Sequence, residues 1–105
     1  MMKTYQMTIA GVERALPICP LNASLAIGAF VIFGDVELTE CAARDLLKKV
    51  PCEYDVMITA ESKGIPLIHE MAKQSGKNTY VLARKVPKLY MKDCIAIEVN
   101  SITTE

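Results

Sequence analysis

The sequence predicts an α/β fold, with strands and helices alternating along a single domain of 105 residues. An apolar strand runs into a polar turn and a helix that begins near a proline, and a second apolar strand follows that helix. Strand, helix and strand in this order form a βαβ unit, whose strands lie parallel and are joined by a right-handed crossover. An apolar content of 51% supplies side chains for a small core.

Composition excludes several classes of protein. Basic and acidic side chains number 12 each, so no net charge attracts nucleic acid. The longest apolar run, residues 25–33, is too short to cross a bilayer, and the N-terminus has no signal-peptide pattern. The four cysteines lack metal-site spacing and His69 is expected to be exposed, so we predict buried, reduced thiols and no protein metal site. We expect a cytoplasmic protein without nucleic-acid or membrane partners, and the high apolar content favours a homo-oligomer such as a dimer.

Strands are predicted for residues 1–36. Residues 5–18 alternate in places between apolar and polar side chains, with Gly11 as a turn, which predicts a hairpin or a bent strand. Pro17 and Pro20 are expected to end it. The β-branched and aromatic residues 25–33 predict a strand buried on both faces.

A helix is predicted over residues 37–51. Thr39 is the expected N-cap, and Glu40 is placed to pair with Arg44 one turn later. Pro51 ends the helix.

The βαβ unit occupies residues 54–85. Its first strand centres on residues 56–58, its helix covers residues 66–75 with Gly76 as the left-handed residue after it, and its second strand covers residues 79–83. A binding site is expected at the carboxyl ends of the two strands.

Cationic and hydrogen-bonding groups gather at those strand ends. Residues 61–64 precede the helix N-terminus, and Arg84 and Lys85 follow the second strand. Backbone amides, the helix dipole, Lys63 and an arginine fork together suit a phosphate or pyrophosphate. The alternative is an ordinary turn beside a solvated Arg-Lys pair. Glu61 either holds Lys63, meets solvent or acts as a base, and we assign it no catalysis.

Residues 86–105 predict a flexible loop. Pro87 and several lysines lie in its first part, and residues 94–99 alternate like one arm of a hairpin. The lysines form either a basic lid over the site or a solvated loop; they are Lys85, Lys88 and Lys92.

In order and spacing, these segments resemble the type I phosphoribosyltransferases, and within them the adenine and xanthine enzymes. ALPICPLNASLAIGAFVIFGDVEL resembles the amino-terminal hood, and DVMITAESKGIPLIHEMAKQSG resembles the first core strand, pyrophosphate loop and helix. YVLARKVPKLYM resembles the second core strand leading into the flexible catalytic loop, and EVNSITT resembles the far arm of that loop. The resemblance implies a Rossmann-like phosphoribosyltransferase fold that is incomplete: hood strands, one βαβ unit and a flexible β-loop.

The resemblance also implies an activity. The family transfers a phosphoribosyl group from phosphoribosyl pyrophosphate (PRPP) to a purine base in nucleotide salvage, with release of pyrophosphate. Magnesium is implied as a cofactor bound through PRPP or pyrophosphate, without protein ligands. PRPP or pyrophosphate and a purine base or nucleotide are the implied partners. The positions that match the family's pyrophosphate contacts are Ala60, Glu61, Ser62, Lys63, Gly64, Arg84, Lys85 and Lys88; no catalytic residue is assigned.

The sequence departs from the family at its defining PRPP motif. That motif is an apolar strand followed by two acids, small residues and Thr-Gly, and no such segment occurs here. Residues 31–35 contain one acid and precede the pyrophosphate loop. We therefore expect a chain truncated before the motif, inactive alone, and prone to self-association through an unpaired strand edge. The alternatives are a non-catalytic phosphate-binding or nucleotide-binding module, regulatory or otherwise, of the same descent, or a subunit completed by another chain.

Overall fold

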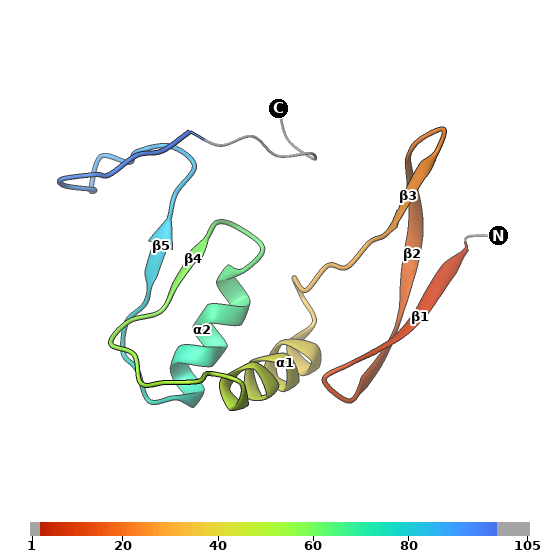
Figure 1. Ribbon diagram of the computed structural model, residues 1–105, viewed down its shortest axis with the longest axis horizontal. Coiled ribbons are helices and arrows are strands. Elements are labelled where there is room, and N and C mark those ends of the chain that lie inside the picture. The colour runs from red at the N-terminus through yellow and green to blue at the C-terminus, as the bar shows by residue number, and fades with distance from the viewer. Residues whose placement is uncertain (1–2, 99–105) are drawn as a thin grey trace.

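Three antiparallel strands form one end of the molecule, and two helices with a parallel strand pair form the other (Figure 1). The structure is a computed structural model that describes residues 3–98. Its elements, in chain order, are β1 (Thr4–Ile9), β2 (Val12–Asn22), β3 (Leu25–Gly28), α1 (Val36–Lys48), β4 (Ile58–Ala60), α2 (Ile65–Gln74) and β5 (Val81–Ala83). The predicted α/β class is confirmed at this level.

Strands β1 and β2 form the predicted hairpin. Ala10 and Gly11 both have positive φ, at 52° and 79°, which matches a two-residue turn whose twist suits antiparallel strands. The predicted strand end at Pro17 and Pro20 is wrong, because β2 continues to Asn22. A proline removes only the N–H donor, and the Pro17 carbonyl still accepts from the Ala29 N–H at 2.8 Å.

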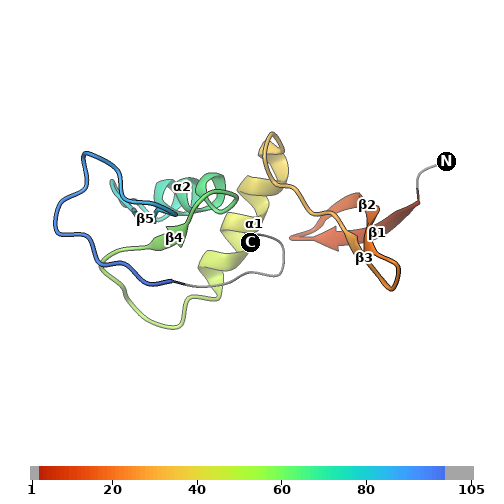
Figure 2. The ribbon, with the colours of Figure 1, turned by 90° about the horizontal axis from the view of Figure 1, so that it is seen from above.

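Strand β3 is shorter and more exposed than predicted. It covers Leu25–Gly28, and all four residues are exposed, so a strand buried on both faces over residues 25–33 is wrong. The sheet order β1-β2-β3 leaves β3 on an edge, and both views show the sheet standing apart from the helices (Figures 1 and 2). Within residues 25–33 only Ile32, at 7% exposure, is buried. The β-branched and aromatic residues therefore identified a strand, but they did not reveal that no other part of the described chain packs over it.

Helix α1 begins three residues before the predicted N-cap. Asp35 caps it, since its Oδ1 accepts the Leu38 N–H at 3.1 Å, and Thr39 instead donates its hydroxyl to the Asp35 carbonyl at 2.7 Å. An aspartate at this position satisfies an N–H that the helix leaves without a partner. The Glu40 to Arg44 ion pair is present at 3.3 Å.

The two helices pack on each other and provide most of the core. Gln74 at the end of α2 donates its side-chain amide to the Glu40 carbonyl of α1 at 3.0 Å. Ala43 of α1 and Ala72 of α2 are both buried, and such small side chains allow two helices to pack closely. The buried apolar residues are Ile32, Leu38, Ala43, Ile68 and Ala72.

The βαβ unit has the predicted parallel pair. Ile58 lies opposite Val81 and Ala60 opposite Ala83. Strand β4 lies two residues later than the centre predicted for it, and β5 is shorter than the predicted 79–83. Helix α2 lies alongside β4 (Figure 1). Gly76 follows the helix with φ of 76°, the left-handed conformation predicted for it.

The fold is extended for its mass. Its accessible surface is 8745 Å², whereas a compact protein of this size exposes about 5,800 Å². Its radius of gyration is 16.5 Å, against about 13 Å for a compact domain. The prediction of buried thiols is wrong for the same reason: Cys19 and Cys41 are half-buried, Cys52 and Cys94 are exposed, and all four are free.

The chain after β5 forms neither helix nor strand up to residue 98. The strand predicted for residues 94–99 is therefore wrong over residues 94–98, while residue 99 and the rest of the predicted loop lie outside the described residues. Between residues 3 and 98, no helix has the length and apolar character needed to cross a membrane.

Candidate anion-binding site

The two strand ends lie side by side, as the βαβ prediction requires. Ala60 and Ala83 are the last residues of β4 and β5 and face each other across the pair. The Glu61 N–H extends the pairing by donating to the Ala83 carbonyl at 3.0 Å. The turn of residues 61–64 and the residues after β5 thus meet at one edge of the sheet.

Glu61 holds the residues after β5. Its Oε1 accepts the Lys85 backbone N–H at 2.5 Å and lies 3.2 Å from Arg84 Nε. The hydrogen bond from the Lys85 N–H is the largest effect and lowers the pKa of Glu61. Burial comes second and raises this pKa, and the positive charges of Arg84, Lys88 and Lys85 then lower it further, so the net direction is downward. A carboxylate with a lowered pKa is a poor base at neutral pH, so of the three alternatives for Glu61 the structure favours a holding role, with Arg84 and the Lys85 N–H as partners instead of Lys63.

Arg84 is held from two sides. Its Nε is inaccessible to solvent and faces Glu61 as an ion pair without an aligned hydrogen bond, and its Nη1 donates to the Tyr90 hydroxyl at 3.2 Å. Among the described residues, Nη2 has no partner. Sequence reasoning missed Tyr90, because nothing in the local pattern marks a tyrosine six residues after an arginine as its partner.

Gly64 is required by a close approach within the loop. A Cβ on this residue would lie 2.4 Å from Thr59 Oγ1, so only glycine lets the turn fold back against β4. The Ile65 N–H donates to the Ser62 carbonyl at 3.2 Å, and the Glu61–Ser62 peptide bond is cis. The loop therefore closes on its own backbone and on β4 before α2 begins.

The loop leaves donors and positive charge available. Within residues 3–98, the backbone N–H groups of Ser62, Lys63 and Gly64 meet no acceptor, and Lys63 has no ion pair. Gly64 caps α2 without a side-chain hydrogen bond, so the positive end of the helix dipole faces the loop. Free amides next to an exposed lysine are the chemistry of an anion site.

The other predicted lysines differ in exposure. Lys85 and Lys92 are exposed, whereas Lys88 is half-buried and its backbone N–H donates to Met91 Sδ at 3.3 Å. The charge of Lys88 also lowers the pKa of Glu61. Lys88 thus contributes positive charge at the site, and the choice between lid and solvated loop stays open.

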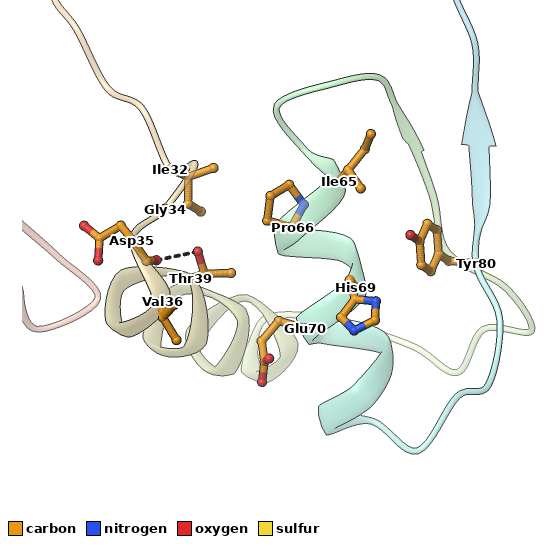
Figure 3. A pocket seen from close by; sticks show the side chains of 10 residues that line it. All are labelled: Ile32, Gly34, Asp35, Val36, Thr39, Ile65, Pro66, His69, Glu70 and Tyr80. Atoms are coloured by element: carbon orange, nitrogen blue, oxygen red, sulfur yellow. Dashed lines mark hydrogen bonds between the residues drawn. The ribbon is translucent and has the colours of Figure 1, made fainter.

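A separate cavity of about 340 Å³ is lined by residues at the start of α1, in the first turns of α2 and by Tyr80 (Figure 3). His69 is exposed, as expected, and meets Tyr80 edge to face with ring centroids 6.3 Å apart. The Asp35 carboxylate points away from α2 and is held by Arg14 at 2.7 Å. The cavity is lined by Ile32, Gly34, Asp35, Val36, Thr39, Ile65, Pro66, His69, Glu70 and Tyr80, none of which is a predicted site residue.

Comparison with known proteins gives no match, either to a protein-family model or to a curated protein. The interpretation of the site therefore rests on its geometry and on the resemblance of the segments that form it.

Proposed function

We propose that the chain is a purine phosphoribosyltransferase-like protein whose loop of residues 60–64 binds the pyrophosphate group of PRPP. The observation that carries the proposal is the meeting of this loop with Arg84 and Lys85 at the carboxyl ends of two parallel strands. Three free amides, Lys63 and the N-terminus of α2 complete a cationic corner.

The chemistry of the group transfer suits such a corner. The ribosyl centre becomes positively charged as pyrophosphate leaves, so catalysis depends on neutralising the leaving group and excluding water more than on a nucleophile. Lys63 acts as a point charge and Arg84 as a planar donor for phosphate oxygens. The 105 residues contain no two-acid Thr-Gly segment for the ribose phosphate. We therefore propose that this chain alone binds pyrophosphate without turning PRPP over.

Magnesium enters the proposal through the ligand. Among residues 3–98, no group of three or more His, Cys, Asp or Glu side chains is placed to hold a metal ion. Glu61, the carboxylate within the site, is already engaged by Arg84 and the Lys85 N–H. Oxygen ligands from pyrophosphate and water suit magnesium, which retains several waters when it binds phosphates.

Titration calorimetry with magnesium pyrophosphate tests the site directly. We expect Lys63→Ala to weaken binding roughly tenfold or more, because a charge-assisted contact to a phosphate oxygen is lost. Lys48→Ala is the matched control, since Lys48 is exposed at the far end of α1. Absence of pyrophosphate binding by the wild type, or equal losses in the two variants, would contradict the proposal.

Activity assays separate binding from catalysis. Release of pyrophosphate from PRPP is measured with adenine, xanthine, hypoxanthine and guanine, because the sequence does not select the base. Clear turnover by this chain alone would overturn the claim that it is insufficient. Submicromolar binding of purine nucleotides without turnover would instead favour the non-catalytic module.

A further inference from the structure

A carboxylate within an anion site needs an explanation. Glu61 is ionised at neutral pH, since its pKa is lowered, and it lies in the turn that offers its amides to the proposed ligand. By Coulomb's law alone, its charge repels an incoming pyrophosphate and weakens binding. If the site binds an anion, the contacts of Glu61 must therefore favour binding by more than this repulsion disfavours it.

Those contacts join the two halves of the site. The Glu61 N–H binds the Ala83 carbonyl, while Glu61 Oε1 accepts the Lys85 N–H and lies 3.2 Å from Arg84 Nε. The side chains of Glu61 and Arg84 are only 17% and 26% exposed. Water screens such a pair less than it screens a fully exposed one. One residue thus connects the turn after β4 to both residues after β5.

The orientation of the guanidinium follows from these contacts. Glu61 lies 3.2 Å from Nε as an ion-pair partner without an aligned hydrogen bond, and the Tyr90 hydroxyl accepts from Nη1, so two of the three nitrogens of a planar group have described partners. Nη2 then remains as the donor without a described partner. An arginine that is already oriented loses less side-chain entropy when an anion binds.

We propose that Glu61 is a positioning residue that orients Arg84 for the pyrophosphate, and that it acts through Arg84 rather than on the ligand. The inference rests on the proposed pyrophosphate site. It assigns Glu61 neither a proton transfer nor contact with the reacting atoms. It makes the presence of a carboxylate a condition for tight anion binding, in the direction opposite to simple electrostatics.

The variant Glu61→Gln separates the two expectations. Glutamine has the same shape and keeps an oxygen that can accept the Lys85 N–H, but it removes the charge that attracts Arg84. Electrostatic repulsion alone predicts that pyrophosphate binds this variant more tightly. Positioning predicts about tenfold weaker binding, because the oriented arginine fork is lost.

A double-mutant cycle tests whether Glu61 acts through Arg84. The pyrophosphate Kd is measured for wild type, Glu61→Gln, Arg84→Ala and the double variant. We expect Glu61→Gln to weaken binding only when Arg84 is present, and to leave it unchanged or tighter in the Arg84→Ala background. Glu53→Gln, at an exposed acid outside the site, is the charge-matched control and should not weaken binding. Equal or tighter binding by Glu61→Gln alone, or the same loss in both backgrounds, overturns the inference.

A measurement without ligand keeps the inference separate from the proposed function. The NMR signal of the Arg84 Nε–H in nitrogen-labelled protein should show a restrained side chain in wild type and a mobile one in Glu61→Gln and Glu61→Ala. Backbone amide spectra establish that the variants keep the fold. A wild type that does not bind pyrophosphate defeats the proposed function. Unchanged Arg84 mobility in folded variants defeats the positioning role, whether or not pyrophosphate binds.

Discussion

The two ends of the molecule are stabilised in different ways. The β1-β2-β3 sheet is an antiparallel arrangement of neighbouring segments, and none of the buried apolar side chains belongs to it. The other end packs α1 against α2, and its strand pair is parallel and short. Backbone hydrogen bonds and cross-strand contacts therefore support the sheet, whereas burial supports the helices.

The sheet carries an apolar face without cover in the described chain. Tyr5, Met7 and Ile18 are exposed by 58%, 44% and 36%, and the strand register places them on one face. Arg14, on this face, reaches the other end by pairing with Asp35 at 2.7 Å and Glu37 at 3.0 Å. This ion-pair cluster is the polar connection between an uncovered sheet and a covered helix pair. The self-association predicted from the unpaired edge of the first βαβ strand is a separate matter and stays a prediction.

The largest expected effect tests burial itself. Leu38 of α1 is 1% exposed, so Leu38→Ala should lower the free energy of unfolding by about 2–5 kcal/mol. Leu25 of β3 is 50% exposed, and Leu25→Ala should lower it by less than about 1 kcal/mol. Urea unfolding followed by circular dichroism measures both. Similar losses in the two variants would mean that Leu25 is covered in solution, and would erase the contrast between the two ends.

A pair of glycines sharpens the comparison. Gly64→Ala places a Cβ against Thr59 Oγ1 and should destabilise the fold by about 1–3 kcal/mol. Gly28→Ala in β3 meets the Leu16 side chain at an ordinary 3.6 Å, and lower entropy of the unfolded chain should stabilise it by about 0.4–1 kcal/mol.

The double variant Gly64→Ala with Thr59→Ala provides the control, because removing Oγ1 removes the clash. Thermal unfolding measures all four proteins. If the second substitution does not restore stability, the close approach of Gly64 to Thr59 is not the reason for the glycine.

Local patterns predicted those parts of the fold that depend on neighbours in sequence. The turn at Gly11 and the left-handed Gly76 each follow from residues within one short segment, and the parallel pair follows from the order of strand, helix and strand along residues 54–85. The N-cap was misplaced at Thr39 because Asp35 and Thr39 are both good caps, and the choice depends on where the preceding chain turns. The prediction that residues 25–33 are buried was wrong, because burial depends on which distant segments pack against a strand, and a local pattern does not show this.

The candidate site, too, has parts that the sequence predicted and parts that it did not. The placement of Arg84 and Lys85 beside the loop followed from βαβ topology, which the sequence order reveals. The role of Glu61 did not follow, because the sequence left it as a partner of Lys63, a solvated carboxylate or a base, and its partners Arg84 and Lys85 lie on a distant segment. The Tyr90 contact depends on the path of an irregular segment, and no local rule predicts such a path.

The smallest expected effect concerns the ion-pair cluster between the two ends, and it depends on pH. Arg14 and the Leu38 N–H lower the pKa of Asp35 from 3.8 to about 2. Because the folded state binds the proton less readily than the unfolded chain, the contribution of Asp35 to stability is present above pH 3.8 and is lost as the pH falls towards 2. Asp35→Asn keeps an N-cap oxygen but removes the charge, so the free energy of unfolding of this variant should change less with pH than that of the wild type within this window.

Urea unfolding at a series of pH values measures the difference, with Asp55→Asn as the control at an exposed aspartate without a described ion pair. Identical pH profiles for wild type and Asp35→Asn would show that Arg14 does not hold the sheet to α1 through this carboxylate.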